Sequence, residues 1–402
     1  MLLVAYALEH FGRHFRLPSV VLLIVVGLVA RQVLEAFGLY YRWVEPAVPV
    51  IGTLGLILIV LEGALDLTVT RERRALIITA AASSLAGFLL CLAAFGLMFN
   101  GLLHLPAHSA ILVAIPFAVI SSAVAIPSAV GLAESRHEFI VYESSLSDIL
   151  GVLVFYAWLG GEGSIEGFAA DLLGGGALSI VAALVAGLAL FYFINQIVGH
   201  VRFLPLLAGL VFLYAIGKEL HLSPLIIVLV CGLVINNPKL LTWHAKLRRV
   251  KSETYTQTLR EFKGLVAELT FATKSFFFLL LGYWTDVKSM LSVEALLVAT
   301  AGIAFILASR WLILKLLRQE GVAQLVWIAP RGLVTVLLFL SAQDTGAVAG
   351  FPFGAVMLVV LVTAALTGFA HRGAHAPEPA AQTATASVAG ATGDSETSTT
   401  AT

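Results

Sequence analysis

The chain has 402 residues, of which 59% are hydrophobic and 12% are charged, and its mean hydropathy is +0.98. A typical soluble domain carries about 25% charged residues, so the composition excludes an ordinary soluble protein and indicates a polytopic membrane protein. The formal net charge is zero, which offers no basis for a nucleic-acid partner. The apolar runs are continuous and of helical length, which favours an all-α membrane protein over a transmembrane β-barrel.

In chain order we expect about thirteen transmembrane helices, because the sequence contains that many separate apolar segments. They cover residues 1–15, 17–36, 46–66, 75–100, 108–133, 138–160, 167–198, 203–217, 222–236, 258–283, 290–317, 322–343 and 351–371. The first is short for a hydrocarbon core ~30 Å thick, so whether it spans the membrane stays open. The Ala, Thr, Ser, Pro and Gly that follow predict a disordered tail over 372–402.

The distribution of basic residues predicts an orientation in the membrane. Most of the 24 Lys and Arg residues follow odd-numbered segments, whereas only Arg31, Arg42, Lys218 and Lys288 follow even-numbered ones. Because basic residues accumulate on the cytoplasmic side, we expect the C-terminus in the cytoplasm and the N-terminus outside. The interpretation is a multi-pass protein of a plasma membrane, of the bacterial inner-membrane type.

Two of the apolar segments contain helix-breaking residues. The fifth contains Pro116, the pair Ser121-Ser122 and Pro127, and the twelfth contains the run Pro330-Arg331-Gly332. Inside a bilayer such breaks persist only where protein or a water-filled cavity satisfies the freed backbone groups. The two segments are seven apart in the count, so they cross the membrane in opposite directions. This arrangement is typical of inverted-repeat transporters, and the alternative is a pair of ordinary proline kinks.

Asp148 lies roughly ten residues into the sixth segment, near the expected midplane. A charge there costs ~2.5–3.5 kcal/mol on insertion scales, and burial favours the neutral form of a carboxyl group. A carboxylate in this position holds either a proton or a hard cation, but not both. Competition between the two is the simplest physical basis for cation/proton exchange. The alternative is a structural Asp that bonds to the backbone of a neighbouring helix.

Glu143 lies five residues before Asp148. The two carboxylates are about 140° apart around a helix axis, so we expect them to have different roles. A buried Glu needs a cationic partner, and the candidates are Arg310 and Arg331, which both lie inside apolar segments. From the residues alone the choice between the two arginines stays open.

Other polar side chains of the apolar segments have less specific interpretations. Serines 121, 122, 144 and 147 lie near Asp148 or the fifth-segment break, but serines in membrane helices commonly bond to the preceding turn. Glu62 and Asp66 are expected to cap the third helix or to pair with Arg71 or Arg74. Lys274 is expected to extend its ammonium group to the membrane interface.

Six runs occur in a characteristic order along the chain. They are Leu61-Glu62-Gly63-Ala64-Leu65-Asp66, Ser121-Ser122-Ala123-Val124, Glu143-Ser144-Ser145-Leu146-Ser147-Asp148, Phe276-Phe277-Phe278-Leu279-Leu280-Leu281-Gly282, Ala308-Ser309-Arg310 and Pro330-Arg331-Gly332. In order and spacing they resemble the monovalent cation/proton antiporter superfamily, in particular its sodium/proton exchanger branch. The run that ends at Asp148 is similar to the Glu-Ser-x-x-Asn-Asp motif of that branch. The resemblance covers most of residues 15–371.

The resemblance implies an inverted-repeat, sodium/proton antiporter-like fold with two crossed broken helices, usually in a homodimer and without a cofactor. It implies dimerisation and scaffold helices over 1–70 and 161–257. It implies an ion-transporting core over 71–160 and 258–371.

The resemblance also implies roles for individual residues. Asp148 would bind the Na⁺ ion and the proton, and the further candidate ligands are Ser147, Ser144 and Ser122. Glu143 would form a structural ion pair with Arg310. The crossing of the broken helices would be organised by Arg331, Pro127 and Pro330.

Two departures from the family pattern bear on transport. Ser147 stands where the exchanger branch has Asn and the electrogenic branch has a second Asp. With one site carboxylate we expect electroneutral exchange of one cation for one proton. Ala125 and Ile126 replace the Thr-Asp that the exchanger branch has before Pro127, so the resemblance does not fix the cation.

The sequence therefore predicts a secondary antiporter that exchanges Na⁺ or Li⁺ for H⁺ at Asp148 and serves pH homeostasis. A K⁺/H⁺ antiporter on the same fold is the nearest alternative. An enzyme is not expected, because no second facing Asp for an intramembrane protease and no metalloprotease or serine-hydrolase motif occurs. A channel or a transport-inactive sensor is the remaining alternative.

Overall fold

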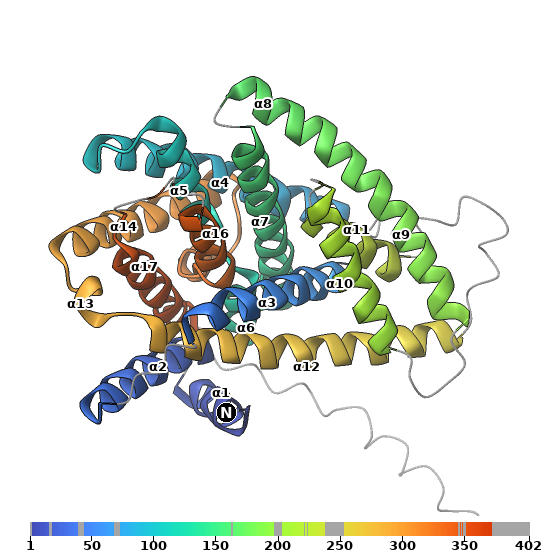
Figure 1. Cartoon of the computed structure of the whole chain (residues 1–402), viewed down its shortest axis with the longest axis horizontal. Helices are drawn as coiled ribbons and strands as arrows, with labels where there is room; N and C mark the ends of the chain where they lie inside the picture. The colour runs from blue at the N-terminus through green and yellow to red at the C-terminus, as the bar shows by residue number, and fades with distance from the viewer. Residues whose placement is uncertain are drawn as a thin grey trace, which may run out of the picture.

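The computed structural model describes residues 2–15, 18–38, 44–67, 73–161, 164–196, 203–220, 222, 224–237, 253–344, 346, 348 and 351–371. Within these ranges the chain is almost entirely helical and contains no strand (Figure 1). The predicted all-α fold is therefore confirmed. The predicted tail over 372–402 lies outside the described residues.

The helices follow one another in the order expected from the apolar segments. The N-terminal part forms α1 (Leu2–Phe15), α2 (Ser19–Ala36), α3 (Val44–Asp66), α4 (Arg74–Leu102), α5 (Ala107–Ala118), α6 (Ser122–Ser128) and α7 (Glu134–Gly160). The middle forms α8 (Ile165–Ala170), the π-helical turn η1 (Asp171–Gly175), α9 (Gly176–Gln196), α10 (Phe203–Glu219) and α11 (Pro224–Asn236). The C-terminal part forms α12 (Glu253–Trp284), α13 (Val287–Met290), α14 (Val293–Leu316), α15 (Val322–Leu325), α16 (Leu333–Asp344), α17 (Phe353–Leu366) and the 3₁₀ turn η4 (Thr367–His371).

Nine segments of the described chain are long and apolar enough to cross a membrane. One of them joins α5 and α6, and α11 and α16 are apolar but shorter. A multi-pass membrane protein is therefore confirmed. Every one of the thirteen predicted segments overlaps a described helix or pair of helices, whereas the number of spans stays a prediction.

The fifth and twelfth predicted segments are each broken into two helices. Residues 119–121 lie outside the helices between α5 and α6, with extended backbone at Val119 and Ser121, and residues 328–332 lie outside the helices before α16. In the fifth segment both prolines lie inside helices, Pro116 in α5 and Pro127 near the end of α6. In the twelfth, Pro330 lies within the non-helical residues 328–332. The first break therefore falls between the prolines, where contacts with other helices satisfy the backbone.

The long helix α12 packs against α2 and α3 along one side of the molecule (Figure 1). Two glycines allow α2 and α12 to approach closely, because a Cβ at Gly27 would collide with the backbone of α12 at Leu279. A Cβ at Gly282 would likewise collide with the backbone of Ile24. On the other side of α3, α11 packs between α3 and α9. These contacts join α2, α3, α9, α11 and α12 into one set of helices.

A second set of helices surrounds the two breaks. Helix α4 packs against α5, α7 and α14, and α14 packs against α17. A cluster of phenylalanine side chains fills the space beside the breaks, with ring centroids 5.1–5.9 Å apart in the contacting pairs; its members are Phe95, Phe99, Phe117 and Phe351. Aromatic pairs of this kind contribute about 0.5–1.5 kcal/mol each beyond their buried area. The cluster fixes the end of α5, from which the first extended segment leaves.

Candidate functional site

The non-helical segments 119–121 and 328–332 meet at a crossing inside the second set of helices. The backbone N–H of Ser121 donates a hydrogen bond to the carbonyl of Pro330 at 2.9 Å. A Cβ at Gly332 would lie 2.9 Å from the Cβ of Ser121 and 3.1 Å from a methyl carbon of Val124. Only glycine therefore lets the second segment approach the first this closely. The crossing brings together residues that are about two hundred positions apart in the sequence.

Asp148 lies on α7, where its side chain is only 3% exposed. The backbone N–H of Ser122 donates to Asp148 Oδ2 at 3.0 Å, and the Ser122 hydroxyl donates to the same oxygen. Because Ser122 is the first residue of α6, the carboxylate reaches the start of the second half of the broken helix. The other oxygen, Oδ1, is buried and has no hydrogen-bond partner among the described residues. One oxygen of the carboxylate is thus fixed to the crossing, and the other is left unpaired.

The neighbouring serines differ in what their hydroxyl groups contact. Ser147 Oγ accepts a hydrogen bond from the backbone N–H of Ile120 at 2.9 Å, which holds the extended segment against α7. Ser144 Oγ donates to the carbonyl of Ile140 at 2.7 Å, in the preceding turn of its own helix. The hydroxyls of Ser121 and Ser145 are buried, and each lacks a partner in the part of the chain that the structure describes.

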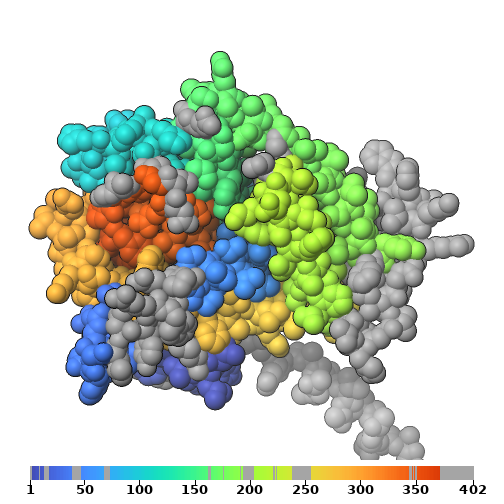
Figure 2. Space-filling model, viewed as in Figure 1, coloured from blue at the N-terminus to red at the C-terminus, as the bar shows by residue number. Residues whose placement is uncertain are grey.

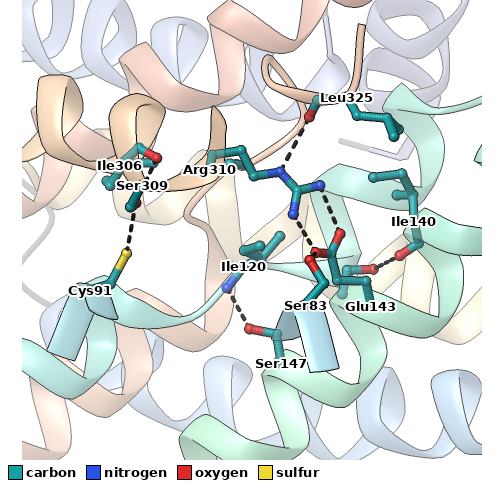
Figure 3. A network of polar contacts seen from close by, with 12 residues as sticks. Ser83, Cys91, Ile120, Ile140, Glu143, Ser147, Ile306, Ser309, Arg310 and Leu325 are labelled. Carbon is teal, nitrogen blue, oxygen red and sulfur yellow. Dashed lines mark hydrogen bonds and ion pairs between the residues drawn. The ribbon is translucent and has the colours of Figure 1, made fainter. Parts of the chain in front are cut away.

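Glu143 and Arg310 form a buried ion pair between α7 and α14. Glu143 is 0% exposed and Arg310 is 5% exposed. Arg310 Nη2 donates to Glu143 Oε2 at 2.7 Å, Nη1 donates to Oε1, and Nε donates to the carbonyl of Leu325 at 3.3 Å (Figure 3). The Ser83 hydroxyl of α4 donates to Glu143 Oε1 at 2.5 Å. The carboxylate therefore has three donors, and the paired fork geometry is the strong form of this interaction.

Arg331 lies in the second non-helical segment, 328–332, and is 1% exposed. Its guanidinium Nε donates to the carbonyl of Phe117 at 2.7 Å, and Nη1 donates to the carbonyl of Ala329 at 2.9 Å. Its backbone N–H donates to the Thr363 hydroxyl of α17 at 2.9 Å. The last carbonyl groups of a helix have no partner within the helix, and Phe117 is next to the last residue of α5. Arg331 therefore caps the first half of the broken helix with a positive charge, which the helix dipole also favours.

Glu62 and Asp66 of α3 lie opposite α12. Glu62 faces Thr270 and Lys274 of α12, and Asp66 faces Lys263 of the same helix. Arg71, one of the arginines expected to pair with them, lies outside the described residues. The carboxylates thus face the long helix that packs alongside α3.

A cavity of about 760 Å³ lies between the two sets of helices. It is lined by residues of α3, α7, α10, α11 and α16, among them Thr53, Tyr156, Tyr214, Lys218 and Ser341. Figure 2 shows this face of the molecule, with α3 in blue between α10 in yellow-green and α16 in orange-red. The cavity is lined by the same helix, α7, that carries Asp148.

The sequence did not single out Ser83 or Thr363, which contact Glu143 and Arg331. The polar pair Ser83-Ser84 inside an otherwise apolar segment could have indicated Ser83. No feature of the sequence indicates Thr363. Among the described residues no group of three or more His, Cys, Asp and Glu side chains could hold a metal ion. The chemistry available at the crossing is therefore that of one carboxylate, several hydroxyls, backbone groups and the guanidinium of Arg331.

Comparisons with known proteins bear on the family and the fold of the chain. The family model described as "Sodium/hydrogen exchanger, transmembrane" matches residues 1–372. A structure of the sodium/proton antiporter MjNhaP1 from Methanocaldococcus jannaschii at pH 8 has a TM-score of 0.68 and 21% identity, and the match covers 92% of this chain and 93% of that one. An electron-microscopy structure of the same antiporter has a TM-score of 0.71 and 21% identity, with coverage of 94% and 97%. The search of curated proteins returned no match.

Proposed function

The chain belongs to the sodium/hydrogen exchanger family, and from this premise we propose that it exchanges Na⁺ or Li⁺ for H⁺ by competition at Asp148. The proposal rests on the hydrogen bonding of the two Asp148 carboxylate oxygens. One oxygen accepts two hydrogen bonds from Ser122, and the other is buried without a partner. Such an oxygen is stabilised either by a proton or by a cation. The family membership supports the membrane setting and the two exchanged ions.

The proposed exchange is electroneutral, with one cation moving against one proton. When Na⁺ replaces H⁺ on a single carboxylate, the net charge of the loaded site is unchanged. Ser147 contributes no second charge, and its hydroxyl accepts from the backbone of Ile120. A cycle that moved one net charge would change in free energy by ~2.3 kcal/mol per 100 mV of membrane potential. The rate of the proposed exchange is therefore independent of the potential.

The proposed moving core consists of α4–α7 and α14–α17, because the crossing, the ion pair and Arg331 link these helices to one another. The proposed scaffold and dimerisation part consists of α1–α3 and α8–α11. We place α12 with the scaffold because it packs against α2 and α3, whereas the sequence interpretation placed residues from 258 onward in the core. The C-terminus is cytoplasmic in this proposal, as the distribution of basic residues predicts.

The test is transport by purified protein in liposomes that contain a pH-sensitive dye. A pH gradient is imposed, and Na⁺, Li⁺ or K⁺ is then added, with and without a clamped membrane potential. Collapse of the gradient on Na⁺ or Li⁺, unchanged by the clamp, is the expected result. Collapse on K⁺ alone would replace the substrate by that of the K⁺/H⁺ alternative.

The site assignment is tested with Asp148→Asn, which is expected to abolish exchange. The matched control is Asp286→Asn, because Asp286 caps α13 by accepting from the backbone N–H of Lys288. An asparagine oxygen can accept the same bond, so this variant is expected to transport normally. Undiminished exchange by Asp148→Asn would refute the site.

A further inference from the structure

Three buried oxygen atoms near the crossing lack hydrogen-bond partners among the described residues. They are Asp148 Oδ1, Ser121 Oγ and Ser145 Oγ, and the three side chains are 3%, 0% and 4% exposed. Buried polar atoms are bonded in the large majority of cases, and an unsatisfied one points to a strained group, a water or an ion. Two of these oxygen atoms, Asp148 Oδ1 and Ser145 Oγ, belong to side chains of one helix, α7, and both are available to a ligand.

Ser145 lies three residues before Asp148 on α7. Side chains three positions apart on a helix are neighbours, with their Cβ atoms about 5–6 Å from each other. A single small ion can therefore contact both side chains. Both lie on the same helix, so their spacing is kept when α7 moves as a unit.

The hydroxyl of Ser145 also lies at the contact between α7 and α3. A Cβ built at Gly63 of α3 would have Ser145 Oγ as its nearest neighbour, at 3.6 Å. Because Gly63 has no side chain, the space in front of this hydroxyl stays open. Ser145 is thus placed on the face of the proposed core that meets the proposed scaffold.

The other serines of this region already have bonded hydroxyls. Ser122 donates to Asp148, Ser147 accepts from Ile120, and Ser144 donates to Ile140. Ser121 faces Gly332 at the crossing, where a Cβ would collide with it. Ser145 is the serine that combines an unbonded hydroxyl, a place beside Asp148 and open space in front of it.

We infer that Ser145 supplies its hydroxyl oxygen as a ligand to the cation that Asp148 binds, with Gly63 leaving the space for this ion between α3 and α7. Hard cations prefer oxygen ligands, so a hydroxyl beside a carboxylate oxygen is suitable chemistry. The inference rests on the proposed function and adds a ligand that the family motif does not include. The proton needs only the carboxylate and makes no use of this hydroxyl.

This difference between the two ions gives a specific signature. If Na⁺ and H⁺ compete for one site, the proton concentration that displaces half of the Na⁺ is proportional to [Na⁺] and inversely proportional to the dissociation constant for Na⁺. The acidic limb of the pH profile is the low-pH range in which protons displace Na⁺ and transport declines. A tenfold weaker Na⁺ affinity therefore moves the midpoint of this limb to a pH about one unit higher. A tenfold higher Na⁺ concentration moves it back. A defect in folding would lower the rate without producing this compensated shift.

The experiment measures the KM for Na⁺ and the acidic limb of transport for Ser145→Ala in the liposome assay. Loss of one ligand is expected to raise the KM about tenfold, within the range seen when groups that support a metal site are removed. The acidic limb is expected to move up by about one pH unit and to return when Na⁺ is raised tenfold. Ser145→Thr keeps the hydroxyl and is expected to retain a KM close to that of the unmodified protein.

Two further variants keep the inference testable if Ser145→Ala folds poorly. Ser145→Cys preserves the side-chain size but replaces the hard oxygen with a soft sulfur, so it is expected to show the same rise in KM. Ser275→Ala is the matched control, because Ser275 on α12 is also a buried serine without a partner among the described residues. This control is expected to leave the KM and the pH profile unchanged.

Two results would overturn the inference while leaving the proposed function in place. One is an unchanged KM and acidic limb in Ser145→Ala and Ser145→Cys while Asp148→Asn is inactive. The other is a larger rise in KM from Ser144→Ala than from Ser145→Ala. Undiminished exchange by Asp148→Asn would instead refute the proposed function itself.

Discussion

The buried ion pair between Glu143 and Arg310 leads to a quantitative prediction about stability. Replacing Arg310 with Met removes both guanidinium bonds to Glu143, whose side chain is 0% exposed. Among the described residues, the carboxylate then keeps the hydroxyl of Ser83 as its one donor. Removal of one partner from a buried pair costs about 3–5 kcal/mol, because an uncompensated charge stays in an apolar environment. We expect Arg310→Met to lower the free energy of unfolding by that amount.

The double variant Glu143→Met/Arg310→Met separates the charge effect from the packing effect. Two apolar side chains of similar volume can replace a buried ion pair at little cost or with a gain in stability. The double variant is therefore expected to be more stable than either single variant. Additive losses in the double variant would refute the reasoning, because they would mean that the two charges do not interact.

The measurement is denaturant or thermal unfolding of the purified protein in one detergent for all variants. The control is Arg73→Met, because Arg73 pairs with Glu138 at 2.5 Å and its side chain is 41% exposed. Exposed pairs contribute about 0–1 kcal/mol, so this variant is expected to change stability little. A loss below about 1 kcal/mol for Arg310→Met would contradict the assignment of Glu143 as a buried charge. Recovery of transport in the double variant would identify the pair as structural.

Three more substitutions test the contacts around the crossing. Ser83→Ala is expected to lower the free energy of unfolding by about 1.5–3 kcal/mol, the range for a hydrogen bond to a charged group. The control is Ser84→Ala, which removes a hydroxyl without a partner among the described residues. It should cost less in the same unfolding assay. Gly332→Ala forces a Cβ against Ser121, so we expect reduced expression and reduced transport. Normal transport would show that the two segments are packed less closely than described. Arg331→Lys keeps the charge but loses the forked guanidinium that reaches two carbonyls. Transport should therefore fall by about tenfold or more in the liposome assay. An unchanged rate would show that the positive charge alone suffices.

The positions of the helices could be predicted because the bilayer requires long apolar runs, and apolar runs are directly visible in a sequence. The two broken helices were also predictable, because Pro330 and the residues around the Ser121-Ser122 pair interrupt such runs. The exact place of the first break was not. It falls at residues 119–121, between Pro116 and Pro127, because Ser147 and Pro330 bond the freed backbone groups there.

The partners of the buried charges were predictable only in part. The sequence places Glu143, Arg310 and Arg331 in the membrane, but spacing rules describe contacts within one helix. The bond from Ser83 to Glu143 joins residues 60 positions apart, and the bond from Arg331 to Phe117 joins residues 214 positions apart. The second bond could not be anticipated from charge at all, since a backbone carbonyl carries no signal in the sequence. The same limit applies to Glu62, which faces Thr270 and Lys274 of another helix, α12.

The buried polar groups of the core fall into two kinds, and the distinction supports the assignment of the site. Glu143, Arg310 and Arg331 each have several partners, and their bonds hold α4, α5, α7 and α14 around the crossing. Asp148 and Ser145 keep one oxygen each without a partner among the described residues. A fully satisfied network specifies one conformation, whereas an unpaired buried oxygen is costly in a low dielectric and would be stabilised by a cation or a proton. In the proposed carrier, the first kind holds the helices around the crossing, and the second kind provides oxygen atoms for the exchanged ion.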